Sequence, residues 1–240
     1  MGAKQAWSSY RSALVLRGHE AGFEDAYRIA DAVPGWFDRV AAACFWSVVH
    51  EVRPRRVVEI GSYLGRSTVF LAESLRHAGI QRSELHAIDP HTGDRQHLEQ
   101  LGLTSLPTLD LFRVFLSASG NHDAVRIHVA SSSEAVTVME PGLDMVFVDG
   151  WHEYDAVLAD VRDFGKLLSP AGVMCVDDVV KLAEVDRASR QGMAAAGLTH
   201  YGFVAGRAWA GRAPEPPSCL RAVLRREQRF QRIASVLRHR

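Results

Sequence analysis

The chain has 240 residues, 47% of them hydrophobic, and its 28 Lys and Arg side chains balance its 28 Asp and Glu side chains. This length and composition predict one globular unit with additions. The zero net charge argues against nucleic acid as the main partner. No apolar run approaches the roughly 20 residues that a membrane-spanning helix needs, and no secretory leader is visible.

The cysteines indicate a compartment. Cys44, Cys175 and Cys219 are odd in number and far apart, and the first two fall in apolar segments. This usage predicts buried free thiols in a reducing environment. We therefore expect a cytoplasmic protein.

Residues 3–53 have the apolar spacing of helices. Ala26, Ile29 and Val33 mark one helix, and the pair Pro34-Gly35 interrupts the pattern. Residues 36–52 then form a strongly amphipathic helix. We interpret residues 1–53 as an N-terminal helical cap, which covers an active site or builds a dimer.

The central stretch of the chain is Val57–Thr68, which reads V-V-E-I-G-S-Y-L-G-R-S-T. Its first residues are β-branched and apolar, as in a strand buried on both faces. Gly61 and Gly65 follow, and a helical pattern begins after them. A strand, a glycine turn and a helix are typical of a nucleotide-type site, where the backbone approaches the ligand closely.

The residues of this turn narrow the choice of ligand class. A dinucleotide motif requires G-x-G-x-x-G, but Ser62 follows the first glycine and the spacing is G-x-x-x-G. The Glu59 carboxylate would repel a pyrophosphate and attract an ammonium or sulfonium group. S-adenosylmethionine carries both groups. The alternative is a tight connection without a ligand.

A second strand, Glu84–Ile88, ends at Asp89, where a carboxylate accepts hydrogen bonds from ribose hydroxyls. The alternative is a helix-capping role. Residues 91–103 are polar and irregular, which indicates a lid or a substrate loop. After a helix at 109–118 and a strand at 125–129, Ser131 and Ser132 either line an adenine pocket or cap the helix that begins near Glu134.

The fourth strand, residues 143–148, ends at Asp149, and a helix is predicted over 155–168. The fifth strand, 173–176, ends at Asp177 and Asp178. This alternation predicts a parallel sheet with helices on both faces and all strand carboxyl ends at one edge. Five acidic residues therefore converge where such sheets bind ligands: Glu59, Asp89, Asp149, Asp177 and Asp178.

Asp149, Asp177 and Asp178 form the group that most specifically indicates a metal site. Neighbouring parallel strands lie about 4.8 Å apart, so carboxylates at their tips can share one ion. Hard oxygen ligands favour Mg²⁺, or Mn²⁺, over zinc. The alternative is that one carboxylate caps a helix and another faces solvent.

His152 lies three residues after Asp149 and is the best candidate for a general base, because its usual pKa suits proton removal near neutral pH. His91, just beyond Asp89, is a weaker candidate.

Four blocks together carry a resemblance: V-E-I-G-S-Y-L-G-R-S-T, A-I-D-P-H-T-G-D, F-V-D-G-W-H-E-Y and L-S-P-A-G-V-M-C-V-D-D. They resemble the class I S-adenosylmethionine-dependent methyltransferases, and within these the metal-dependent O-methyltransferases of small molecules, over about residues 34–210. The similarity is strongest to bacterial enzymes that act on sugars of antibiotics and polysaccharides, and weaker to the catechol type.

The resemblance implies a doubly wound, Rossmann-like sheet of seven strands in the order 3-2-1-4-5-7-6 within a core at 54–212. Tyr201–Val204 and Ala208–Gly211 would supply its antiparallel hairpin. It implies that Glu59, Gly61 and Ser67 hold the methionine end of the donor, Asp89 the ribose and Ser132 the adenine. Ser62, Gly65, Ser131 and Asp149 complete the expected cofactor set, and Asp149, Asp177 and Asp178 would bind Mg²⁺. His152 stands where relatives carry a lysine or an aspartate base.

The expected acceptor is a hydroxyl of a small molecule, most simply a saccharide, with a catechol-type phenol as the alternative. Trp36 and Trp151 can stack on either. Two other classes remain on the same sheet: a nicotinamide-dependent oxidoreductase, whose motifs are missing, and a non-catalytic binding protein. We also expect a homo-oligomer, with a dimer favoured.

Residues 213–240 end the chain with apolar residues at helical spacing from Leu220 onward, among many arginines. This basic amphipathic helix is predicted to pack its apolar stripe on its own domain or across a dimer. The alternative is an anionic membrane or an acidic partner.

Overall fold

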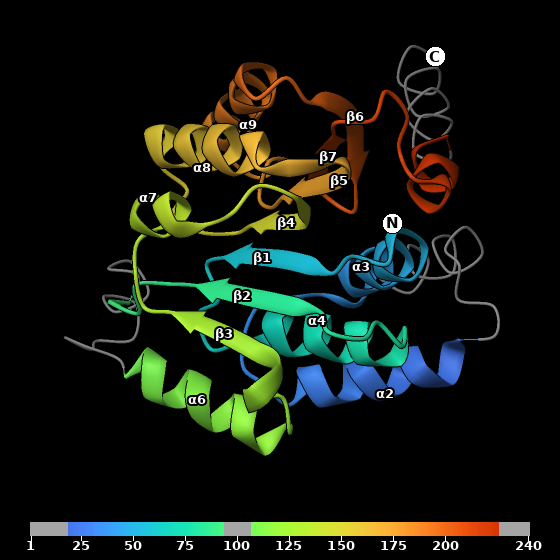
Figure 1. The fold of residues 1–240 in the computed structure, drawn as a ribbon, viewed down its shortest axis with the longest axis vertical. Helices are drawn as coiled ribbons and strands as arrows, with labels where there is room; N and C mark the ends of the chain where they lie inside the picture. Colours follow the sequence, from blue (N-terminus) through green and yellow to red (C-terminus); the bar gives the residue numbers. More distant parts are fainter. Residues whose placement is uncertain (1–18, 94–106, 226–240) are drawn as a thin grey trace, which may run out of the picture.

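The computed structural model describes residues 19–93 and 107–225. In this part of the chain, seven strands form one sheet in the order β3-β2-β1-β4-β5-β7-β6 (Figure 1), which confirms the predicted order. The first five strands are parallel, and β7 and β6 form the antiparallel hairpin. The strands are β1 (Arg56–Ile60), β2 (Glu84–Ile88), β3 (Val125–His128), β4 (Leu143–Val148), β5 (Leu168–Val176), β6 (Thr199–Val204) and β7 (Arg207–Gly211).

Helices cover both faces of the sheet, as predicted. One core cluster joins the sheet to α2, α3, α4 and α6, and the other joins it to α8 and α9. The α-helices are α2 (Glu20–Asp31), α3 (Arg39–Val52), α4 (Arg66–His77), α6 (Thr108–Ala118), α7 (Ser132–Ala135), α8 (Tyr154–Lys166) and α9 (Ala183–Ala195), and the 3-10 helices are η1 (His122–Ala124) and η2 (Val136–Val138).

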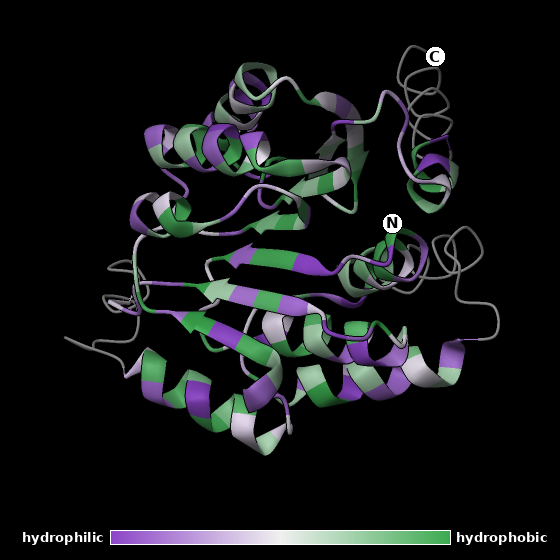
Figure 2. Cartoon of the chain, in the orientation of Figure 1, coloured by the Kyte–Doolittle hydropathy of each residue, from purple (hydrophilic) through white to green (hydrophobic). Residues whose placement is uncertain are grey.

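Strand β1 explains this layering. Val57 and Val58 are both fully buried but belong to different core clusters, because successive side chains of a strand point to opposite faces. Figure 2 shows the same distribution: β1 is mostly hydrophobic, whereas β2 and β3 also carry hydrophilic residues. A strand between two apolar layers carries mostly apolar side chains, as the sequence predicted for Val57, Val58 and Ile60.

In the described part of the predicted N-terminal cap lie α2 and α3, and residues 1–18 of that cap lie outside the described residues. Helix α3 starts three residues later than predicted, because the Asp38 carboxylate accepts hydrogen bonds from the N–H groups of Val40 and Ala41, at 2.8 and 3.0 Å. All residues from Ala41 to Val49 are buried. The helix is therefore enclosed on nearly every side rather than amphipathic as expected.

The fifth strand also differs from the prediction. It begins at Leu168, not at residue 173, and α8 ends at Lys166. The pairing of β4 with β5 shifts between Leu143 and Met145, so that Leu168 pairs before the irregular Pro170–Gly172 stretch. This register shift lets a proline and a glycine lie inside the strand, where their presence had indicated a break.

The predicted C-terminal helix is present over residues 218–225, and residues 226–240 lie outside the described residues. Leu220 and Val223 are fully buried in the chain's own core. The start of the apolar stripe therefore packs on its own domain. Within the described ranges, no helix has both the length and the apolar character that crossing a bilayer requires.

The Gly61 turn should tolerate no side chain. Gly61 has a φ of +88°, and a Cβ atom there would lie 2.1 Å from the backbone oxygen of Asp149. We expect Gly61→Ala to lower the free energy of unfolding by more than about 3 kcal/mol, since backbone strain adds to the clash. The control is Gly79→Ala, at a φ of +63° with no atom within 4 Å, which should cost only about 1–2 kcal/mol. Equal effects in urea unfolding would contradict this explanation.

Candidate functional site

The carboxyl ends of the central strands are tied together by backbone hydrogen bonds. The N–H of Gly61 donates to Ile88, and the N–H of Asp149 donates to Ile60, both at 2.9 Å. The N–H of Asp177 likewise donates to Val148 at 2.9 Å. These bonds join the residues just after β1, β4 and β5 to the ends of the neighbouring strands. The sheet therefore brings Glu59, Asp89, Asp149, Asp177 and Asp178 to one edge, as predicted.

The glycine turn fits closely between this edge and α4. Gly61 packs against the Asp149–Gly150 backbone, and Gly65, with a φ of +95°, is the N-cap of α4. A Cβ atom on Gly65 would lie 2.9 Å from the ring of Phe112. Both glycines are therefore required by close approach, and the turn directs the N-terminus of α4 toward the edge.

Glu59 is the fully buried acid of the site. Burial raises the pKa of Glu59 to about 7, although the hydroxyls of Ser67 and Thr68 oppose the shift. The Thr68 hydroxyl donates to one carboxyl oxygen, Oε2. The other oxygen, Oε1, and the Ser62 hydroxyl are buried with no hydrogen-bond partner among the described residues. Unpaired buried polar atoms are costly, so this corner is suited to a polar ligand.

Asp89 anchors the glycine turn to the end of β2. One of its carboxylate oxygens accepts a hydrogen bond from the N–H of Tyr63 at 2.8 Å, and the other accepts one from the N–H of His91 at 2.7 Å. Each oxygen keeps further acceptor capacity for a ligand. The His91 side chain is only 2% exposed and packs on Phe112 of α6, which removes it from consideration as a base.

The two serines after β3 have different roles. Ser131 caps α7, because its hydroxyl accepts from the N–H of Glu134 while the Glu134 carboxylate accepts from the N–H of Ser131. The Ser132 hydroxyl interacts instead with Asp160 of α8, a buried acid that sequence reasoning missed. Burial raises the pKa of Asp160 to about 6. Ser131 therefore serves the local capping of α7, whereas Ser132 links this turn to α8.

The paired acids after β5 are engaged by cationic side chains. Asp177 is 2.7 Å from Arg207, between Oδ2 and Nη2, and its Oδ1 accepts from the N–H of Asp178 at 2.6 Å. Asp178 has a left-handed φ of +55° and lies between His152, at 3.1 Å from Nε2 to Oδ2, and Lys181. The contact with His152 holds the pKa of Asp178 well below its usual range.

These contacts decide whether the predicted metal ligands fit a divalent cation. In the described ranges, no three His, Cys, Asp or Glu side chains are arranged as a metal site. Asp149 has no hydrogen bond from a described side chain, and burial together with the Asp177 charge raises its pKa well above the usual range. Asp177 and Asp178 have protein donors on both carboxylate oxygens. As they lie, the three carboxylates do not fit a cation.

Two tryptophans border the site. Trp36 is 69% exposed and stacks on Tyr63 of the glycine turn, with 5.8 Å between the ring centroids. Trp151, two residues after Asp149, is 56% exposed. Large exposed aromatic side chains on a monomer indicate a contact surface for a ligand or a partner.

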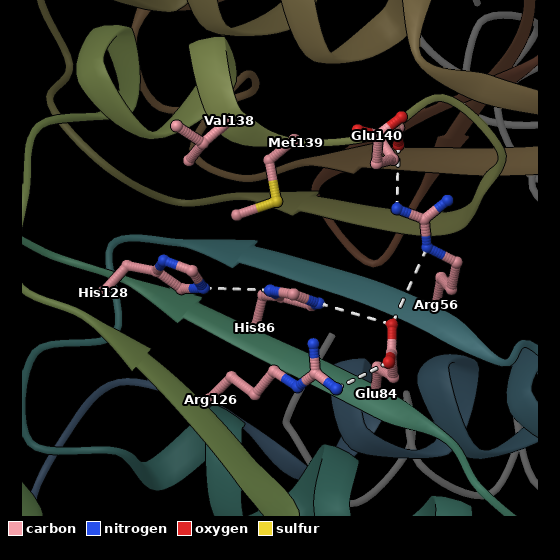
Figure 3. A pocket seen from close by; sticks show the side chains of 8 residues that line it. All are labelled: Arg56, Glu84, His86, Arg126, His128, Val138, Met139 and Glu140. Carbon is pink, nitrogen blue, oxygen red and sulfur yellow. Dashed lines mark hydrogen bonds and ion pairs between the residues drawn. The ribbon is translucent and has the colours of Figure 1, made fainter.

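A separate hollow of about 440 Å³ lies beside β1, β2 and β3 and is also lined by residues 138–140 (Figure 3). His86 and His128 meet there at 2.9 Å between ring nitrogens, and Glu84 pairs with Arg126. None of the predicted site residues lines this hollow. The candidate site is therefore the acidic edge and not this hollow.

The site thus combines a glycine turn, a buried acid and an aspartate at the tip of β2, at the edge where doubly wound α/β sheets bind ligands. The family profile "Methyltransferase domain" matches residues 58–179, just over half of the chain. The chain therefore belongs to the methyltransferase domain family.

Individual relatives are distant. The uncharacterized protein y4gI of Sinorhizobium fredii is 29% identical over 133 residues, which cover 55% of this chain and 14% of that protein. The chain thus spans only a small part of that relative. The O-methyltransferase TomG of Streptomyces achromogenes, solved with S-adenosylmethionine, is 21% identical, with a TM-score of 0.55 over 88% of this chain and 97% of TomG. The O-methyltransferase NovP is 16% identical, with a TM-score of 0.60 over 72% and 80%. Both solved structures share the fold.

The buried Glu59 should make stability depend on pH. Its pKa is raised in the folded protein, so ionisation opposes folding, and stability is lost as pH rises from the unfolded value toward about 7. Between pH 5.5 and 7.5 the wild type should lose on the order of 2 kcal/mol that Glu59→Gln does not lose. Urea unfolding of both proteins at the two pH values measures the difference, and parallel curves would refute the prediction.

Proposed function

We propose that this chain is an S-adenosylmethionine-dependent O-methyltransferase that acts on a hydroxyl group of a small molecule. The observation that carries the proposal is the buried Glu59 carboxyl, whose Oε1 lacks a hydrogen-bond partner beside the glycine turn. An ammonium group supplies the hydrogen bonds and the charge that such a carboxyl requires. Membership of the methyltransferase family and the S-adenosylmethionine bound to TomG support the choice of donor.

The donor site is proposed to follow the strand tips. Glu59, Gly61, Ser62, Gly65 and Ser67 would hold the methionine end around the glycine turn. Asp89 would accept hydrogen bonds from the ribose, and Asp149 lies against Gly61. Toward the adenine, Ser132 is favoured over Ser131, whose hydroxyl already caps α7. The unpaired Ser62 hydroxyl supports the assignment of the methionine end.

When bound, the donor supplies a sulfonium methyl group that is already activated for transfer. The chain must then orient the acceptor and take its proton. We propose His152 as the base: Asp178 contacts its Nε2, which fixes the ring orientation and stabilises the imidazolium that forms when the ring takes the acceptor's proton. Asp178 is in this role a positioning residue.

Mg²⁺ at Asp149, Asp177 and Asp178 stays a prediction from the sequence. The bonds from Arg207, His152 and Lys181 to these carboxylates weigh against it. No step proposed here depends on a metal ion.

A saccharide is proposed as the acceptor on the basis of the sequence resemblance, and a catechol-type phenol is the second candidate. The exposed Trp36 and Trp151 offer stacking surfaces for either. A dimeric state and a cytoplasmic location stay predictions, as does the division into residues 1–53, 54–212 and 213–240.

Calorimetric titration tests the donor. We expect S-adenosylmethionine to bind with a dissociation constant in the micromolar range, about −8 kcal/mol, and NADH not to bind. Glu59→Gln should weaken binding by about tenfold or more, because a charged hydrogen bond is lost. Methyl transfer to a panel of sugars and catechols then separates the acceptors. The same assays with and without EDTA show whether turnover needs a metal ion. No binding of S-adenosylmethionine would overturn the proposed function, and binding without turnover would favour a non-catalytic protein.

Removal of the base tests the mechanism. His152→Ala should lower kcat by about 10²–10⁴-fold and leave the affinity for S-adenosylmethionine unchanged. Asp178→Asn keeps the left-handed backbone favourable and should lower kcat less. The matched control is His122→Ala, since the His122 side chain is 56% exposed and lies in η1. A kcat of wild-type size in His152→Ala would exclude this histidine as the base.

A further inference from the structure

The antiparallel hairpin brings an arginine to the acidic edge. In the pairing of β5 with β7, Val176 lies opposite Ala208. One step further along this register, Asp177 lies opposite Arg207, the first residue of β7. The arginine therefore reaches the edge from the side opposite to β4, as a consequence of strand register.

The Arg207 side chain is only 6% exposed and is fixed by several contacts. Its Nη2 is 2.7 Å from Oδ2 of Asp177, and its Nη1 donates to the carbonyl of Ala205 at 2.9 Å and lies 3.4 Å from Asp38. Its Nε is buried with no partner in the described part of the chain. A guanidinium buried in this way cannot exchange its carboxylate partner for water without a large cost in free energy.

A divalent cation at this edge would compete with that guanidinium. Binding would require Asp177 to turn from Arg207, or would place a doubly charged ion beside a buried positive charge. Asp178 is similarly engaged by Lys181 and His152. The buried Arg207 thus already occupies the cation position beside Asp177, and the exposed Lys181 adds a second positive charge beside Asp178.

We propose that Arg207 takes the place of a divalent cation at Asp177, so that the edge formed by Asp149, Asp177 and Asp178 does not bind Mg²⁺ or Mn²⁺. The inference concerns the same site as the proposed function. It does not depend on which methyl acceptor is used.

Mn²⁺ binding to the full chain tests the proposal. Binding is measured, without any substrate, through the electron paramagnetic resonance signal of free Mn²⁺. The wild type should show no saturable binding up to about 1 mM, a free energy near −4 kcal/mol. Arg207→Met removes the charge at similar length and should bind Mn²⁺ at least about tenfold more tightly, and adding Asp177→Asn should abolish that gain. Arg207→Lys is the matched control, which keeps the charge and should bind as weakly as the wild type.

Stoichiometric Mn²⁺ binding by the wild type that Asp177→Asn abolishes would overturn the proposal. If Arg207→Met does not fold, the comparison of the wild type with Asp177→Asn still decides, because equal weak binding supports the proposal. Calorimetry with S-adenosylmethionine is run separately on the wild type. A failed donor titration would therefore count against the proposed function alone.

Discussion

Backbone packing at the carboxyl edge of the sheet is the constraint on which the site depends. The N–H groups of Gly61, Asp149 and Asp177 donate to the last residues of neighbouring strands, and Gly61 leaves no room for a Cβ atom against the Asp149 backbone. Because each strand tip is bonded to the next, the acidic side chains cannot separate without loss of sheet hydrogen bonds. Their proximity, and the perturbed pKa of Glu59 and Asp149, follow from this arrangement.

The site combines two kinds of carboxyl group. Glu59 is fully buried and Asp149 is half-buried, and neither has a basic hydrogen-bond partner in the described part of the chain, so desolvation raises the pKa of both. Asp177 and Asp178 instead lie beside Arg207, His152 and Lys181. The glycine turn therefore has an acceptor without a described partner, Oε1 of Glu59, whereas the charges of Asp177 and Asp178 at the tip of β5 are balanced by neighbouring basic side chains. A cationic ligand is favoured at the first location and disfavoured at the second.

Periodicity and turn residues predicted the first five strands and the acidic edge, because buried parallel strands and glycine turns have strong local patterns. The strand order and the antiparallel hairpin were implied by the family resemblance. What the sequence could not provide depends on pairing between distant segments. Arg207 meets Asp177 only through the register of β7 on β5, and Asp160 meets Ser132 only through the packing of α8. Thr68, which was not among the predicted site residues, had a local signal: a hydroxyl in the first turn of α4 after the glycines. Leu168 belongs to β5 because of a register shift between β4 and β5, and the spacing of apolar residues in the sequence does not predict such a shift.

The enclosure of α3 has a mechanical consequence. A helix with one apolar stripe can lift from a surface at modest cost, but the run from Ala41 to Val49 is buried from all sides. Lifting it would expose a large part of the core formed with β1, β4 and α4, at a cost comparable to the whole stability of a domain. Helix α3 therefore stays in position and cannot swing as a gate.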